Sequence, residues 1–188
     1  PFDGEWQTRA DLLRWIGTVQ AERGDLEAAW ASFAASRSVA EQAGLREQES
    51  SALVSQAGVE LLRGKLEVAA ELFLQARRMA EAVEQERLLA LIDMNLGIIA
   101  NIQGNVSTAL LSYRSSLDRY RHLQDDSSTT RALMNMGMAH ADLAEWEAAE
   151  ACFAEAGALA SQTRDSVMIG RIELNRTELH LKLGRFAD

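Results

Sequence analysis

The chain has 188 residues, of which 47% are hydrophobic and 25% charged, a length that suits one large domain or one short repeat array. The formal charge of −9 and the absence of a basic patch exclude a typical nucleic-acid-binding protein, and no run of eighteen apolar residues predicts a membrane span. A single proline, Pro1, and an abundance of Ala, Leu, Glu and Arg predict an all-α protein.

Apolar residues recur at spacings of three and four along successive segments, which is the period of an amphipathic helix. This period predicts paired helices in chain order, each pair joined by a short turn. The predicted segments are 6–22, 26–43, 46–63, 66–83, 86–103, 106–123, 126–143, 146–161 and 165–183.

A turn motif repeats every forty residues without an insertion. The segment Gly24-Asp25-Leu26-Glu27-Ala28-Ala29 is followed by similar segments that begin at Gly64, Gly104, Ala144 and Gly184. Glycine at such a position allows a left-handed backbone and a tight turn. A fixed period of this length indicates an array of helical hairpins, in which each hairpin buries its apolar faces against its neighbours.

Two further positions in the second helix of each hairpin follow the same period. One is a small residue and the other is an aromatic residue. The small residues are Ala29, Ala69, Ala109 and Ala149, and the aromatic residues are Phe33, Phe73, Tyr113 and Phe153. Small residues allow helices to approach closely, and we expect the aromatic ring to fill the space between neighbouring hairpins.

With pairs such as Leu96-Gly97 and Met136-Gly137 in the first helix, these positions resemble the tetratricopeptide repeat family, in a variant with forty rather than thirty-four residues per repeat. The resemblance implies an α-solenoid of antiparallel helical hairpins wound into a right-handed superhelix. It covers nearly the whole chain. The chain departs from the family pattern in lacking the helix-ending proline, and in carrying Gln56-Ala57 and Arg176-Thr177 where the leucine-glycine pair is expected.

We expect a single repeat domain over residues 1–188. Its repeats are predicted at about 6–45, 46–85, 86–125 and 126–164, with an incomplete fifth repeat at 165–188. Because the chain starts without methionine and stops inside the fifth repeat, we expect it to be a fragment of a longer protein, and its arginine bias suggests a bacterial source.

In the family, the first helix of each hairpin lines the concave surface, so the register assigns residues of this chain to a groove. The resemblance gives the following groove residues: Val54, Leu61, Leu62, Leu91, Met94, Ile98, Ile102, Arg131, Met134, Met138 and Arg171. The other positions of the same face are Asp11, Arg14, Thr18, Ala21, Glu22, Ser51, Gly58, Asn101, Ala141, Asp142, Leu174, Glu178, Leu181 and Lys182.

This face is polar at both ends and apolar in its middle, where segment 86–103 is apolar on nearly every side. An exposed apolar patch usually marks a binding surface, and methionines such as Met94 and Met134 would adapt to an apolar partner. The alternative is that tight curvature buries these side chains against one another.

An asparagine precedes the leucine-glycine position in three repeats: Asn95, Asn135 and Asn175. The resemblance implies that these amides hold the backbone of a bound peptide, because an amide supplies both a donor and an acceptor. The alternative is a structural hydrogen bond between adjacent hairpins.

The sequence contains no complete constellation for catalysis or metal binding. His140 and His180 share a register position, but a metal ion needs further ligands, and we interpret both as packing or solvated residues. We therefore expect no enzymatic activity, no cofactor and no metal.

We expect the module to bind a protein or peptide, with no nucleic-acid or membrane partner. The alternative function is a sensor arm of a larger bacterial signalling or transcription-regulating protein. The single cysteine, Cys152, and the lack of a signal peptide favour a cytoplasmic location. We also expect self-association through helix 165–183, which would expose Ile172, Leu179 and Leu183.

Overall fold

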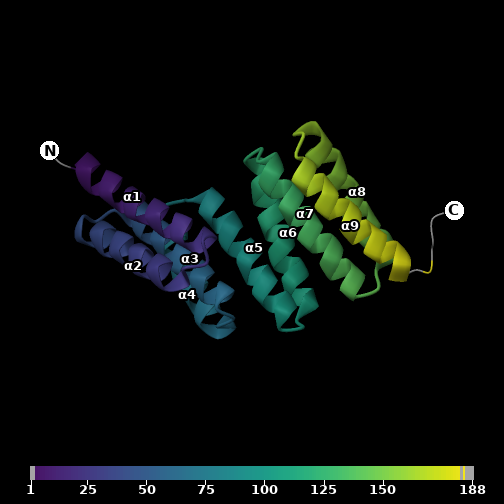
Figure 1. The fold of residues 1–188 in the computed structure, drawn as a ribbon, viewed down its shortest axis with the longest axis horizontal. Coiled ribbons are helices and arrows are strands. Elements are labelled where there is room, and N and C mark those ends of the chain that lie inside the picture. Colours follow the sequence, from purple (N-terminus) through teal and green to yellow (C-terminus); the bar gives the residue numbers. More distant parts are fainter. Residues whose placement is uncertain (1–2, 183, 185–188) are drawn as a thin grey trace. The chain divides into compact units, whose positions relative to one another are not determined.

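The computed structural model describes residues 3–182 and Gly184. Within them the chain forms α-helices that run antiparallel to their neighbours in sequence, and no strand (Figure 1). The helices are α1 (Asp3–Glu22), α2 (Leu26–Gln42), α3 (Arg46–Leu62), α4 (Leu66–Ala82), α5 (Glu86–Ile102), α6 (Val106–His122), α7 (Asp126–Asp142), α8 (Trp146–Gln162) and α9 (Ser166–Lys182). The prediction of an all-α solenoid of helical hairpins is confirmed. The predicted helix ends are reproduced to within one residue, except that α1 begins three residues earlier than predicted.

The chain divides into two compact units, Pro1–Asn95 (unit 1) and Leu96–Asp188 (unit 2). In unit 1, α1 packs against α2 and α3, and α3 packs against α2 and α4. In unit 2, α7 packs against α6 and α8, and α9 packs against α8 and α7. In both units a helix therefore contacts its sequence neighbours, as expected of stacked hairpins.

The turns reveal a shorter period than the sequence does, because a left-handed residue follows the helices every twenty residues. Positive φ angles occur at Gly24, Gly44, Gly64, Glu84, Gly104, Gln124, Ala144, Arg164 and Gly184. The first turn shows the hydrogen bonding: Gly24 N donates to Ala21 O at 2.9 Å and Asp25 N donates to Gln20 O at 3.0 Å. This pair of bonds is the Schellman motif, which satisfies carbonyl groups left over at the helix end. Turns within hairpins and turns between hairpins thus share one geometry.

At three of the turns an aspartate side chain also accepts a hydrogen bond from the backbone. Asp25 Oδ1 accepts from Ala28 N at 3.1 Å, Asp125 Oδ1 from Ser128 N at 3.1 Å, and Asp165 Oδ1 from Met168 N at 2.9 Å. These aspartates cap the next helix, because they satisfy an amide group that has no partner within the first turn.

Four left-handed positions hold residues other than glycine, among them Ala144 with a φ of 57°. A left-handed conformation is costly for a residue with a Cβ atom. Ala144 lies at the position that glycine occupies in the other within-hairpin turns. The sequence predicts a turn at Ala144, but only the structure shows that this residue has a positive φ angle.

Replacement of Ala144 by glycine should therefore raise the free energy of unfolding by about 0.5–1 kcal/mol, because it relieves strain that exceeds the entropic cost of glycine. Urea titration followed by circular dichroism would measure it. The matched control, Gly64→Ala, should lower the unfolding free energy by a similar amount. A destabilised Ala144→Gly variant would contradict the assigned turn geometry.

Glycines in three first helices lie directly beneath the repeated aromatic ring. A Cβ atom added at Gly17 would lie 2.5 Å from a ring carbon of Phe33, and one added at Gly137 would lie 2.6 Å from a ring carbon of Phe153. Gly97 faces Tyr113 in the same way. The ring therefore packs closely within its own hairpin, as well as against the next one, where Phe33 shares a buried cluster with Val59.

Gly137→Ala should lower the free energy of unfolding by about 1–3 kcal/mol, because the new methyl group overlaps the Phe153 ring. Gly170→Ala, in the same unit, is the control: no atom lies within 4 Å of its added Cβ, so alanine should stabilise α9 by about 0.5–1 kcal/mol. Thermal unfolding of both variants would measure these two changes in stability. Equal effects of the two substitutions would show that the ring does not need the glycine.

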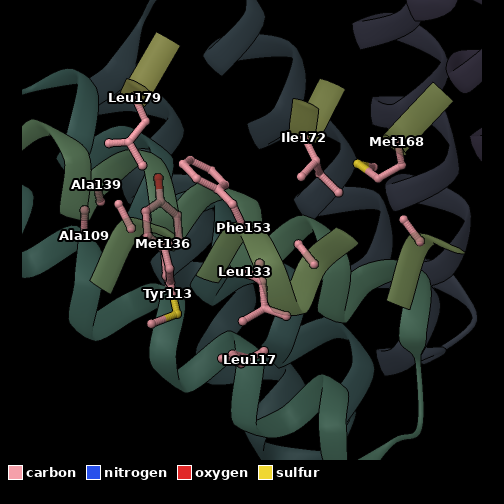
Figure 2. Close-up of a cluster of buried hydrophobic side chains, with 14 of the residues drawn as sticks. Ala109, Tyr113, Leu117, Leu133, Met136, Ala139, Phe153, Met168, Ile172 and Leu179 are labelled. Atoms are coloured by element: carbon pink, nitrogen blue, oxygen red, sulfur yellow. The ribbon is translucent and has the colours of Figure 1, made fainter. Parts of the chain in front are cut away.

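The buried core of unit 2 runs from α6 to α9. Figure 2 shows Leu179, Ile172 and Met168 of α9 directed toward the layer that contains Phe153 and Leu133. Ile172 and Leu179 are almost completely buried. The prediction that they would be exposed for self-association is wrong, because they pack on the preceding helix α8. Leu183 lies outside the described residues.

The most deeply buried charged side chain in the described residues is Asp93. Asp93 on α5 takes the register position of Leu13, Leu53 and Leu133, and it is almost fully buried. Arg77 on α4 donates a hydrogen bond from Nη2 to Asp93 Oδ1 and forms an ion pair with it. A buried carboxylate needs such a partner, so the α4–α5 contact in unit 1 depends on this pair.

Candidate functional site

The first helices of unit 1 enclose an open groove of about 410 Å³, which we call the unit 1 groove. It lies between α1 and α3, with Phe33 of α2 and Asn95 of α5 also contributing. Its lining residues are Thr18, Ala21, Glu22, Phe33, Ser55, Gly58, Val59, Leu61, Leu62 and Asn95. Several residues that the register assigns to the predicted face, such as Leu61 and Leu62, line this groove.

The floor and the rim of the unit 1 groove differ in chemistry. Phe33 and Val59 are buried and form an apolar floor, whereas Leu62 is 66% exposed at the rim. Gly58 leaves open space, since no atom lies within 4 Å of a Cβ added there. Glu22 is the only charged residue in the lining. Such a groove suits an apolar side chain with a neutral or basic neighbour.

The polar residues of this groove are held by their own helices. The Asn95 amide nitrogen donates to Leu91 O at 2.8 Å, Ser55 Oγ donates to Ser51 O at 3.1 Å, and Thr18 Oγ1 donates to Arg14 O at 3.1 Å. Each bond joins a residue to the one four positions earlier. The remaining hydrogen-bonding capacity of each amide or hydroxyl can serve a ligand.

Unit 2 has a smaller hollow of about 60 Å³ at the same register positions, which we call the unit 2 groove. Its lining is Met138, Ala141, Asp142, Phe153, Asn175, Glu178, Leu179 and Lys182. Each of these residues lies 120 positions after a residue that lines the unit 1 groove. Longer and charged side chains replace Gly58 and Leu62, which explains the smaller volume.

The structure brings some of the predicted groove residues together and separates others. Leu61, Leu62 and Asn95 line the unit 1 groove, and Met138 and Asn175 line the unit 2 groove. Val54 and Met94 are buried, so substitutions there would disturb packing as well as any surface. Ile102 is exposed, and Leu91 and Asn135 are half-buried.

The remaining predicted residues do not line either groove. Ile98 and Met134 are half-buried against the unit 2 core. Arg171 is exposed, and exposed Arg131 donates from Nη2 to Ser128 Oγ at 2.9 Å. The sequence prediction omitted Phe33, Val59 and Phe153, which form the floors. The repeated aromatic positions of Phe33 and Phe153 predicted packing, and no sequence signal showed that these two rings would also reach the grooves.

Burial raises the pKa of Tyr113 to about 12, and the Asp142 carboxylate contributes a smaller increase. Phenylalanine takes the Tyr113 position in the other complete repeats, so the hydroxyl is not required for packing. An unfolded chain ionises this phenol near its ordinary pKa of 10. The folded state therefore binds the proton more tightly.

Between pH 10 and about 12 the free energy of unfolding should fall as pH rises, because the unfolded phenol loses its proton first. Below pH 10 this residue should contribute no pH dependence. Tyr113→Phe should remove its share of the decrease, which denaturant titrations of both proteins above and below pH 10 would measure. Identical slopes in the two proteins would contradict the assignment.

Local contacts account for two of the three histidines, His140 and His180, and for the cysteine. His140 Nδ1 lies 2.6 Å from Glu145 Oε2, and His180 Nε2 lies 3.7 Å from Glu150 Oε2. Burial raises the pKa of the Cys152 thiol, which packs against the unit 2 core. Among residues 3–182 and Gly184, no three His, Cys, Asp or Glu side chains are grouped to hold a metal ion.

No helix in the described part of the chain has the length and apolar character that crossing a membrane requires.

Comparison with solved structures shows that other helical-repeat proteins share this fold. No family model and no curated protein matches the chain. Among solved structures, the Rap conjugation gene regulator of plasmid pLS20, in complex with the Phr* peptide, is similar with a TM-score of 0.84 and 16% identity, over 93% of this chain and 47% of that one. Aspartyl phosphate phosphatase F from Bacillus subtilis has a TM-score of 0.82 and 15% identity, over 89% of this chain and 44% of that one.

A third similar structure is a signal transduction ATPase with numerous domains from Pyrococcus horikoshii, which carries a tetratricopeptide repeat sensor. Its TM-score is 0.74 at 14% identity, over 89% of this chain and 26% of that chain. This chain spans about half the length of the two Rap-type proteins. At these identities the likeness shows the fold, which is a tetratricopeptide-like helical repeat.

Proposed function

We propose that this chain is a protein-interaction module, a divergent member of the tetratricopeptide repeat family, that binds a peptide or an amphipathic helix in the unit 1 groove. The observation that carries the proposal is the groove itself, in which an apolar floor, an open glycine and hydrogen-bonding side chains lie together. The similar Rap regulator of pLS20, which was solved with a bound Phr* peptide, supports a peptide as the ligand.

The chemistry of the groove favours a short segment with an apolar anchor. Phe33 and Val59 would contact that anchor, while Asn95 and Ser55 would hydrogen-bond the backbone beside it. Glu22 would favour a basic flanking residue. An acidic chain with one carboxylate in this lining is poorly suited to nucleic acid, so we propose a protein partner.

The predicted groove residues that lie outside the two hollows remain proposed contact residues, each within its own unit. They are Val54, Leu91, Met94, Ile98, Ile102, Arg131, Met134, Asn135 and Arg171. Buried members such as Met94 would act by shaping the face, and exposed members such as Ile102 would touch the ligand directly.

A second function, a sensor arm within a larger bacterial signalling or transcription-regulating protein, is supported by the tetratricopeptide repeat sensor of the Pyrococcus ATPase. In that case ligand binding in the groove would be read by another domain. We propose a cytoplasmic location for either function. We place no reaction on this chain, although one structural neighbour is named a phosphatase.

Selection of peptides from a displayed random library on the 188-residue chain should yield ligands with an apolar anchor. Gly58→Phe should weaken their binding at least tenfold, because the new ring fills the open space in the groove. Gly170→Phe is the matched control, since it also adds a ring at an open helical glycine, outside the groove, and should bind as the wild type does.

Isothermal calorimetry on the selected peptide would compare the three proteins, and circular dichroism would verify their folding. Unchanged affinity in Gly58→Phe would reject the groove as the binding site. Failure of the library to yield any specific peptide would reject peptide binding.

A further inference from the structure

The polar side chains of the unit 1 groove present mainly hydrogen-bond acceptors. The hydroxyl hydrogens of Thr18 and Ser55 are already donated to carbonyl groups of their own helices, each at 3.1 Å. Each hydroxyl oxygen therefore has only lone pairs left for a ligand. The Asn95 amide adds a carbonyl oxygen and one remaining N–H group, and Glu22 adds a carboxylate, whereas the described lining contains no Lys, Arg or His. A ligand in this groove must supply most of the donors.

Two helix C-termini add negative potential to the same groove. α1 ends at Glu22 and α3 ends at Leu62, and both residues belong to the lining. The C-terminus of a helix carries about half a negative elementary charge, which a basic side chain in the last turn can offset. Neither α1 nor α3 has a basic residue in its last turn. The groove therefore favours a positive charge that its own lining does not provide.

The two arginines that follow these helices do not provide this charge within the groove. Arg23 and Arg63 come directly after α1 and α3, and neither of them lines the groove. Arg63 is engaged between α2 and α3, because its Nη2 lies 2.7 Å from Glu27 Oε1 and its Nη1 lies 2.5 Å from Glu60 Oε1. In the described part of the chain, Glu22 has no ion-pair partner.

The unit 2 groove differs in this respect, because it contains a basic residue of the chain itself. Lys182 takes the register position of Leu62, lines the unit 2 groove and places its Nζ 3.1 Å from Glu178 Oε1. Asp142, the equivalent of Glu22, belongs to the same lining. In unit 2 the chain supplies the cation, whereas in unit 1 the same position holds an apolar leucine.

These charges favour one kind of peptide over the others. A C-terminal carboxylate, an acidic side chain or a phosphate would lie among acceptors without a basic partner, and it would lose water contacts at a cost. A lysine or arginine side chain supplies several donors and a positive charge. Its apolar stem can also cover Leu62, which is 66% exposed at the rim, and a free terminal amine lacks such a stem. The net charge of −9 attracts a basic segment before it binds.

We propose that the unit 1 groove selects a basic peptide segment, in which a lysine or arginine stands next to the apolar anchor. The anchor contacts Phe33 and Val59. The stem of the basic residue covers Leu62, and its charged group reaches Glu22 and the C-terminal ends of α1 and α3. This inference rests on the proposed function, because it specifies the ligand of the same groove.

Peptides selected from a displayed library of random ten-residue sequences on the 188-residue chain should carry Lys or Arg beside the apolar residue. One such peptide, synthesised with both ends blocked, is then compared with versions in which Gln or Glu replaces the basic residue. Calorimetry should show binding about tenfold weaker with Gln, because an ion pair and the attraction to two helix ends are lost. The Glu version should bind still more weakly, and added salt should weaken only the basic peptide.

Variants of the protein test the same charge from the other side. Glu22→Gln should weaken the basic peptide about threefold, as expected for one exposed ion pair, and should leave the Gln version unchanged. Leu62→Lys gives unit 1 the ammonium group of unit 2 and should weaken the basic peptide more than Leu62→Gln does. Glu41→Gln is the matched control, since it removes an exposed carboxylate near the C-terminal end of α2, outside the groove, and should bind as the wild type does.

The outcomes separate this inference from the proposed function. Selected peptides that lose affinity in Gly58→Phe, yet bind equally well with Lys, Gln or Glu beside the anchor, would overturn the basic preference and keep the groove as the binding site. Equal affinities of Glu22→Gln and Glu41→Gln for the basic peptide would overturn it as well. Peptides that bind Gly58→Phe as tightly as the wild type, or a library that yields no peptide, would reject the groove and this inference together.

Discussion

The constraint on which the structure depends is the left-handed turn that recurs every twenty residues. Each turn from Gly24 to Arg164 closes a helix with the same two backbone hydrogen bonds, and three residues separate the end of that helix from the start of the next. All helices after α1 consequently have seventeen residues. Equal lengths keep every residue at the same height and on the same face as its equivalents in other hairpins. Without that regularity, neither the grooves nor the buried contacts between helices would recur at matching positions.

This regularity explains why the sequence predicts the helices so closely. Glycines at positions such as Gly24 and Gly64 mark turns directly, and the apolar period marks the helices between them. The twenty-residue period was not predicted, because Glu84, Gln124 and Arg164 adopt the left-handed conformation without being glycine. At those positions the packing of the adjacent helices imposes a turn that local sequence preference does not favour.

The groove was predicted less completely than the fold, for a reason that lies in the register. A repeat position specifies a face of a helix, but exposure on that face depends on the side chains around it. Leu62 and Val54 both belong to the predicted face, yet Leu62 lies open at the rim while Val54 is buried. Similarly, Gly58 and Glu178 share one register position and produce hollows of very different volume. The prediction for Ile172 was wrong for the same reason. Ile172 on α9 is buried, whereas its repeat equivalent Leu12 on α1 is exposed.

The proposed ligand would lie along the first helices of unit 1. An NMR titration of the isotope-labelled chain with a peptide selected on this chain tests that placement directly. We expect the largest shift changes at Thr18, Ser55, Gly58 and Leu62, on the facing sides of α1 and α3. Changes confined to α2 and α4, or spread evenly over the chain, would contradict it.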